Sequence, residues 1–135
     1  MAVVVDASVA IKWFIDELGS DVARALWRDE PDLIAPDLLV PEVCNAAWRK
    51  VRRGETHPAQ AQQIAQRLRG GVLALRPTAP LAARTLELAL ALDHPVSDCF
   101  YLALAEAEQV GLVTADRRLQ SRLRGTSWEA SVRTL

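Results

Sequence analysis

The stretch Val3-Val4-Val5-Asp6 is the clearest indication of the fold in this chain, because three β-branched residues are followed at once by a carboxylate. Such a short, wholly apolar run is typical of a strand buried on both faces of a parallel sheet. Leu112-Val113-Thr114-Ala115-Asp116 repeats the pattern near the other end of the chain. Open parallel sheets bind ligands beyond the carboxyl ends of their strands. The two stretches therefore predict a parallel sheet with acidic side chains at that edge.

Between these strands the sequence alternates helical and strand patterns. We predict an α/β fold with three layers, α/β/α, and a central parallel sheet of four to five strands. Thr56 and Ser97 fit as N-caps of two of the helices. Helices are expected over residues 8–15, 20–28, 38–53, 56–68, 79–92, 97–109 and 117–123, and strands over 3–6, 33–35, 72–75, 112–114 and 131–134.

Length and composition indicate one globular domain over residues 1–135. Half of the 135 residues are hydrophobic and 24% are charged, which suffices for a core. The start lacks a basic segment typical of a signal peptide, and no apolar run approaches the ~18–20 residues that span a bilayer. We therefore expect a soluble, cytoplasmic protein without membrane contact. The net charge of −1 gives no overall attraction to nucleic acid.

The cysteines, histidines and tryptophans give less information about function than the acidic residues do. Cys44 and Cys99 form no C-x-x-C pair, and we expect buried, reduced thiols. His57 and His94 each stand beside a proline, which indicates surface turns. Four tryptophans are many for so small a domain and predict a homodimer with aromatic anchors, although burial of all four in the core would explain them as well: Trp13, Trp27, Trp48 and Trp128.

Four acidic residues stand at the edge of, or inside, apolar stretches: Asp6, Glu42, Asp98 and Asp116. Carboxylates are rarely placed against buried surface without a compensating charge. Glu42 shares a helical face with Leu39 and Ala46 and should point inward. Four inward carboxylates repel one another unless a cation binds them. Hard oxygen ligands favour Mg²⁺, or Mn²⁺ in its place, which activates water and orients a phosphodiester.

Each of these residues also has a purely structural interpretation. Asp6 and Asp116 fit as N-caps, and Asp98 fits as an ordinary acid in the first turn of a helix. Around them, Ser8 and Thr114 each stand two positions from an aspartate and can orient a carboxylate or a metal-bound water by hydrogen bonding, although Ser8 fits a helix cap equally. Lys12 can reach a substrate phosphate or lie on a solvated helix face. The basic end of the third helix, residues 49–53, is explained by RNA binding or by dipole complementarity.

The chain resembles the PIN-domain family along nearly its whole length. The matching motifs are Val-Val-Asp-Ala-Ser-Val-Ala-Ile-Lys-Trp (4–13), Ala-Pro-Asp-Leu-Leu-Val-Pro-Glu-Val (35–43), Ser-Asp-Cys-Phe-Tyr-Leu-Ala-Leu-Ala-Glu (97–106) and Leu-Val-Thr-Ala-Asp-Arg-Arg-Leu (112–119). Their order and spacing are most similar to VapC-type toxins of prokaryotic toxin–antitoxin pairs. Cys99 stands where the family often has alanine, which leaves the four acidic positions intact.

The resemblance implies a Mg²⁺-dependent endoribonuclease that acts on RNA, forms a homodimer and is inhibited by a cognate antitoxin. It implies that Asp6, Asp98 and Asp116 hold metal, and that Glu42 holds metal or positions the attacking water. Two alternatives remain open at this point: a PIN nuclease of RNA processing outside toxin–antitoxin systems, and a non-catalytic module whose acidic pocket captures a basic peptide.

Overall fold

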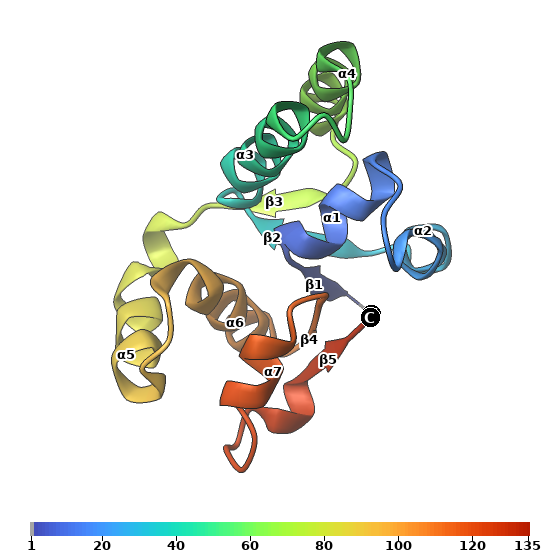
Figure 1. Ribbon diagram of the computed structural model, residues 1–135. Helices are drawn as coiled ribbons and strands as arrows, with labels where there is room; N and C mark the ends of the chain where they lie inside the picture. Colours follow the sequence, from blue (N-terminus) through green and yellow to red (C-terminus); the bar gives the residue numbers. More distant parts are fainter. Residues whose placement is uncertain (1) are drawn as a thin grey trace.

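A five-stranded, all-parallel sheet forms the centre of the molecule. The structure is a computed structural model and describes residues 2–135. The strands lie in the order β3-β2-β1-β4-β5, and every neighbouring pair is parallel. The predicted parallel α/β sheet is therefore confirmed, with the fifth strand included (Figure 1). The strands are β1 (Val3–Val5), β2 (Leu33–Pro36), β3 (Ala74–Arg76), β4 (Gly111–Thr114) and β5 (Val132–Thr134).

Helices cover both faces of this sheet, giving the three predicted layers. The connections from β1 to β2 to β3 place α1 to α4 together on one face, and α5 to α7 lie on the other (Figure 1). This division follows from right-handed crossover connections, because the chain reverses its direction across the sheet after β3. The helices are α1 (Ala7–Phe14), α2 (Ser20–Asp29), α3 (Leu39–Arg52), α4 (Pro58–Arg69), α5 (Ala82–Leu92), α6 (Val96–Glu108) and α7 (Arg117–Arg122).

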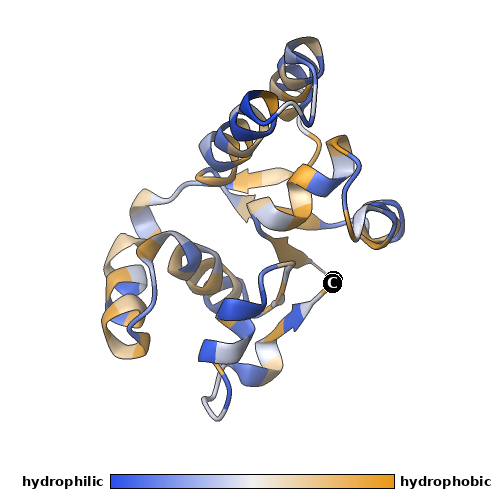
Figure 2. Cartoon of the chain, in the orientation of Figure 1, coloured by the Kyte–Doolittle hydropathy of each residue, from blue (hydrophilic) through white to orange (hydrophobic). Residues whose placement is uncertain are grey.

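The core lies along the two central strands and the helix that packs on them. Val4 and Val5 of β1 and Leu112 of β4 are fully buried. On one face α6 packs against β1, β2 and β4, and its residues 101–105 are all buried. Figure 2 shows the apolar colour concentrated on the sheet and on these inner helical faces. The apolar pattern of the sequence therefore fixes both the sheet and the position of α6.

The order of the strands creates a crevice at one place in the sheet. β1 is followed in sequence by β2 on one side, whereas β4 pairs with its other side. Adjacent connections leave β1 and β4 toward opposite faces, so their carboxyl ends open between the two helical layers. Asp6 directly follows β1, and Asp116 stands two residues after β4. The topology thus brings two of the predicted site residues to the same edge.

Several local expectations differ from the structure. His57, not Thr56, caps α4, because its Nδ1 accepts a hydrogen bond of 3.0 Å from the amide of Ala59. Pro95 precedes α6, so Ser97 lies inside the helix. The third strand begins two residues later than expected, at Ala74. These shifts are local, because caps and strand ends depend on a few hydrogen bonds rather than on the apolar pattern.

The two cysteines differ in their burial. Cys99 is buried as expected, and its desolvation raises the pKa of the thiol to about 11. Cys44 is exposed, which contradicts the expectation of burial, because it lies on the outer side of α3.

Among the described residues no single helix is long and apolar enough to cross a membrane. Only Ala79–Leu92 and Val96–Glu108 together reach that length, with a bend of 116° between them.

Candidate active site

The four predicted carboxylates line one cavity. It has a volume of about 230 Å³ and lies at the carboxyl ends of β1 and β4. Asp6 comes from the end of β1, Glu42 from the first turn of α3, Asp98 from the first turn of α6 and Asp116 from the start of α7. Residues that are up to 110 positions apart in the sequence thus share one small space. Ser8 lies in the same lining.

Asp6 is the most deeply buried member of this group. Only 8% of the residue is exposed, and no ion pair reaches its carboxylate from the described part of the chain. Its oxygens accept hydrogen bonds from the hydroxyls of Ser8 and Thr114 and from the amide of Val9. Burial nevertheless raises the pKa of Asp6 to about 6 because these neutral donors only partly offset desolvation. No basic side chain of the described residues therefore compensates the charge of this carboxylate.

Ser8 and Thr114 lie where hydrogen bonding to Asp6 was expected. Thr114 is fully buried, and its Oγ1 also accepts a hydrogen bond of 3.0 Å from the amide of Asp116. Ser8 Oγ accepts one of 2.9 Å from the amide of Ala115. These two hydroxyls therefore tie the end of β1 to the segment after β4. Ser8 is not the helix cap, because Asp6 caps α1.

Glu42 is held by a residue that the sequence did not single out. The hydroxyl of Tyr101 donates a hydrogen bond of 2.6 Å to Oε1 of Glu42. Burial raises the pKa of Glu42, Tyr101 lowers it, and the nearby charge of Asp98 raises it again. Tyr101 stands three residues after Asp98, which places both on one face of α6. That spacing is the signal by which Tyr101 could have been found.

Asp98 faces a second residue that sequence reasoning missed. His94 was expected on a surface turn, but its side chain is only 7% exposed and its Nε2 lies 2.8 Å from Oδ2 of Asp98. The chain after α5 turns through Asp93 in the left-handed conformation, with a φ of 49°, and this turn folds the imidazole back over the first turn of α6. The expectation of a surface position for His94 is therefore wrong, because Asp98, four residues later, bonds the imidazole and holds it against α6.

Asp116 is paired with an exposed side chain, that of Arg118. The guanidinium of Arg118 binds both of its oxygens, with a distance of 2.8 Å from Nη2 to Oδ2. This hydrogen bonding lowers the pKa of Asp116. Asp6 and Asp116 are also N-caps of α1 and α7. The capping interpretation and the shared cavity are thus both true, since a cap uses only part of a carboxylate's hydrogen-bonding capacity.

The donor set suits a hard divalent cation. Four carboxylates line the cavity, whereas the cations near them are Arg49 in the lining and Arg118 on Asp116. An all-oxygen set favours Mg²⁺ or Mn²⁺ over softer metals. The carboxylate of Asp98 is turned toward His94, and that of Asp116 toward Arg118. Among the described residues, no three potential metal ligands are therefore close enough together to hold an ion in these orientations. The buried, uncompensated charge of Asp6 is the observation that fits a cation best.

Lys12 does not join this group. Its ammonium bonds Oε1 of Glu17 at 2.9 Å and the carbonyl of Leu18 at 2.7 Å, and it does not line the cavity. Lys50 binds the same Glu17, so both lysines belong to one ionic cluster beside α1. Of the two interpretations given for Lys12, this position does not support a phosphate contact at the cavity, and the ammonium is instead bonded within the ionic cluster. Arg49, one turn beyond Ala46 on α3, occupies the cavity wall instead.

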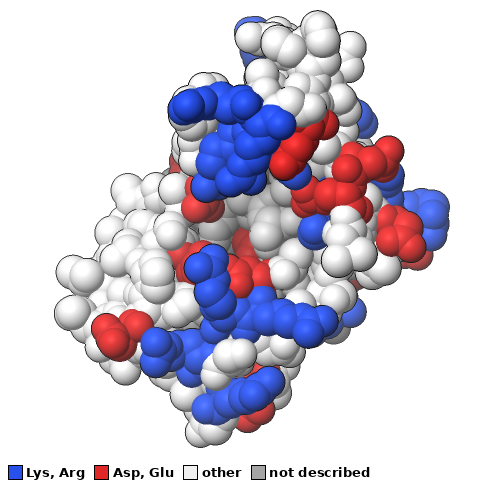
Figure 3. Space-filling model, viewed as in Figure 1, with Lys and Arg blue, Asp and Glu red and all other residues white. Residues whose placement is uncertain are grey.

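Basic side chains border the acidic cavity on two sides of this face. Figure 3 shows a hollow with acidic atoms at its base, bordered by Lys and Arg atoms above it and below it. The upper border lies over α3, and the lower one lies over α7 as placed in Figure 1. The overall charge of the chain is −1, so this separation of charge is local. The arrangement suits an anionic ligand that approaches a cation site.

Comparisons with known proteins agree with this geometry. The PIN domain family matches residues 3–125. Ribonuclease VapC3 of Pyrobaculum aerophilum is 32% identical over 124 residues, which cover 90% of this chain and 95% of that protein. The family match spans β1 to β4 and all four carboxylates.

Solved structures share the fold. The crystal structure of PAE2754 from Pyrobaculum aerophilum superposes with a TM-score of 0.72 at 24% identity, covering 93% of this chain and 90% of that one. A toxin–antitoxin complex from Klebsiella pneumoniae gives a TM-score of 0.70 at 18% identity, with 98% and 96% coverage. With the family match over nearly its whole length, the chain belongs to the PIN domain family.

Proposed function

We propose that the protein is a divalent-cation-dependent endoribonuclease and the toxin of a toxin–antitoxin pair. The observation that carries this proposal is the convergence of Asp6, Glu42, Asp98 and Asp116 on one cavity at the switch point of the sheet. The name of the 32% identical relative, a ribonuclease, supports RNA as the substrate. A cytoplasmic location is part of this proposal, because an RNA substrate would be met there.

In this proposal Asp6, Asp98 and Asp116 hold Mg²⁺, which Mn²⁺ can replace, and Glu42 either joins them or orients the attacking water. When bound, the cation supplies Lewis acidity at the phosphodiester and charge stabilisation during in-line displacement. Tyr101 occupies Oε1 of Glu42, while Oε2 has no hydrogen-bond partner within residues 2–135. That free oxygen is suited to accept a proton from water, and the raised pKa of Glu42 favours this transfer.

The other residues of the cavity have supporting roles. Ser8 and Thr114 fix the carboxylate of Asp6 by their hydroxyls, and His94 fixes that of Asp98. Such partners orient ligands and commonly change metal affinity or activity by about 10- to 100-fold when removed. Arg49 at the cavity wall is placed to bind a substrate phosphate.

Cleavage of RNA by the purified protein tests the proposal. Single-stranded RNA should be cut in Mg²⁺ and in Mn²⁺ and remain intact in EDTA, and Asp6→Asn should be inactive. Asp21→Asn is a matched control, because Asp21 is an exposed acid in the first turn of α2. Full activity in EDTA, or activity with zinc alone, contradicts the proposal. Binding of a basic peptide without any cleavage would identify a non-catalytic module instead.

An antitoxin and a second copy of the chain are the proposed protein partners. One structure with the same fold comes from a toxin–antitoxin complex, which supports the first. For the second, Trp13 and Trp27 stack with their ring centroids 5.1 Å apart on α1 and α2, so they belong to the domain itself. Trp48 is 53% exposed and Leu90 of α5 is 76% exposed, and these remain available to a partner. Light scattering at micromolar concentration should give a dimer, and a monomer would contradict it.

A further inference from the structure

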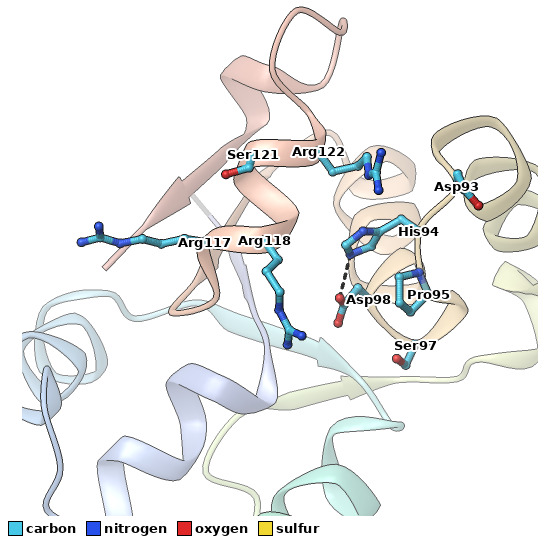
Figure 4. A pocket seen from close by; sticks show the side chains of 9 residues that line it. All are labelled: Asp93, His94, Pro95, Ser97, Asp98, Arg117, Arg118, Ser121 and Arg122. Atoms are coloured by element: carbon cyan, nitrogen blue, oxygen red, sulfur yellow. Dashed lines mark hydrogen bonds and ion pairs between the residues drawn. The ribbon is translucent and has the colours of Figure 1, made fainter.

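A second, larger cavity adjoins the acidic one. Its volume is about 810 Å³. One wall is α7, through Arg117, Arg118, Ser121 and Arg122. The other is the turn between α5 and α6 with the start of α6, through Asp93, His94, Pro95, Ser97 and Asp98. We call it the arginine groove. Figure 4 shows Arg122 pointing from α7 toward the turn and Arg118 pointing toward Asp98, while Arg117 points away from both.

The arginine groove opens onto the acidic cavity. Asp98 lines both spaces. Arg118 lines the groove and binds Asp116, which lines the acidic cavity, so its guanidinium lies at the junction. The acidic cavity, with about 230 Å³, has room for a reacting group but little of the chain on either side of it. A linear substrate must therefore leave through a neighbouring space, and the groove is the larger one that joins it.

The helix that carries these arginines is fixed from beneath. Leu119 is 2% exposed, and Leu123, the residue after α7, is fully buried. Because these two side chains point inward, Arg118 and Arg122 are directed outward, four positions apart on one face. Arg122 has no carboxylate within ion-pair distance among residues 2–135, whereas Arg24, Arg28, Arg76 and Arg84 are all paired. Arg122 is thus an exposed guanidinium without an ion-pair partner among residues 2–135, carried by an anchored helix beside the proposed site.

We propose that the arginine groove binds the sugar–phosphate backbone of the RNA on one side of the cleaved bond, with Arg118 and Arg122 contacting successive phosphates. This rests on the proposed function. Guanidinium groups bind phosphate through paired N–H donors, and the hydroxyls of Ser97 and Ser121 add neutral donors. The lining has a single apolar residue, Pro95, so it offers no pocket for the apolar anchor that a peptide partner would need.

Salt-dependent binding distinguishes this groove from the rest of the surface. A fluorescent single-stranded RNA is titrated in EDTA, where cation-dependent cleavage is absent, over a range of salt concentrations. Each phosphate contact contributes about −0.7 to the slope of log K against log salt for a single strand. Arg122→Gln should reduce the slope by about 0.7, and Arg118→Gln with Arg122→Gln by about 1.4. The affinity at low salt should fall about 3- to 10-fold for each substitution.

Matched variants exclude a general loss of charge. Arg69→Gln removes an exposed arginine at the end of α4, before β3, and should leave both slope and affinity unchanged. Arg122→Lys should keep the slope, because the charge remains, and lose affinity, because the paired donors are gone. Melting curves confirm that each variant is folded. Should the double variant unfold, Arg122→Gln alone decides the test.

The outcomes separate the groove from the proposed function. The proposal that the groove binds RNA is overturned if Arg122→Gln leaves the slope unchanged, or if the unaltered protein binds no RNA at the lowest salt. It is also overturned by a result in which polyglutamate, but not RNA, loses affinity in the same variant, since the groove would then hold an acidic peptide. Cleavage in Mg²⁺ is measured separately. RNA binding that depends on Arg122 without any cleavage would uphold the groove and overturn the nuclease.

Discussion

The hydroxyl of Tyr101 donates a hydrogen bond of 2.6 Å to Oε1 of Glu42, joining α6 to α3 across the acidic cavity. The two residues are 59 positions apart in the sequence. Tyr101 is 2% exposed, and burial raises the pKa of its hydroxyl, so it remains a donor at neutral pH. The bond leaves Glu42 with one fixed oxygen and one free oxygen. This asymmetry is what a residue that orients water requires.

Tyr101→Phe removes this hydrogen bond at nearly constant volume. The free energy of unfolding should fall by about 1–2 kcal/mol, since Glu42 is only half-buried and water replaces part of the lost interaction. RNA cleavage should fall more than RNA binding, because the carboxylate is no longer oriented. Denaturant unfolding and cleavage rates at saturating Mg²⁺ measure the two effects. Equal losses of binding and cleavage would assign Tyr101 a purely structural role.

The stability of the cation-free protein should fall as pH rises from about 4 to about 6. The pKa of Asp6 is raised by burial from 3.8 to about 6, so the folded state binds a proton that the unfolded state releases over this range. A group with a raised folded pKa stabilises the fold below its unfolded pKa, and that advantage is lost as pH passes the folded pKa. The full effect is about 2–3 kcal/mol.

The lowered pKa of Asp116 acts in the opposite sense, since its contribution is lost on acidification below its unfolded value. The change in stability caused by Asp116 therefore falls at a lower pH than the change caused by Asp6. Melting curves in EDTA across this range test the expectation, and Asp6→Asn should flatten them. A rise in stability from pH 4 to pH 6 in the unaltered protein would be inconsistent with an uncompensated Asp6.

Asp98→Asn distinguishes a shared cation site from an ordinary acid in the first turn of a helix. It removes one of the converging charges and keeps an oxygen facing His94. We expect cleavage to drop at least about 100-fold, by comparison with losses at residues that only support metal ligands. In EDTA the variant should be as stable as the unaltered protein or more so, and Mg²⁺ should raise its melting temperature less.

Asp21→Asn is the matched control for Asp98→Asn, because Asp21 is also an acid in the first turn of a helix, on α2. It should lose a little stability from the helix dipole and keep its full response to Mg²⁺. If Asp98→Asn behaves like this control, being destabilised in EDTA with an unchanged Mg²⁺ shift, Asp98 acts only on its helix.

Thr114→Val should cost about 1–3 kcal/mol of stability, because it removes the donor to buried Asp6 and the acceptor for the amide of Asp116. The pKa of Asp6 should rise further, so the loss of stability between pH 4 and pH 6 should become larger. Thr114→Ser keeps the hydroxyl and should retain the original pH dependence, losing only the packing of one methyl group. Identical pH profiles for the two variants would show that the hydroxyl does not act on Asp6.

The apolar pattern of the sequence was enough to predict the layers and the parallel sheet. Runs such as Val3-Val4-Val5 and residues 112–114 carry no charge and are followed within two residues by an aspartate, so burial on both faces is the arrangement that removes them from water. The same pattern placed Glu42 inward, because it lies on the apolar side of its helix. A carboxylate at the end of each central strand then indicated where the site lies.

Only the tertiary structure decided which neighbours complete that site. Tyr101 and His94 look like a core aromatic and a turn residue in the sequence, and Lys12 looks like a residue that could reach the substrate. Their roles depend on distances between elements far apart in the chain: the packing of α6 against α3, the left-handed turn at Asp93, and the ionic cluster around Glu17. Hydrogen bonds and ion pairs act over a few ångströms and need a fixed direction, whereas hydrophobic burial depends only on the area removed from water. Periodicity therefore reveals burial, and the fold alone reveals partners.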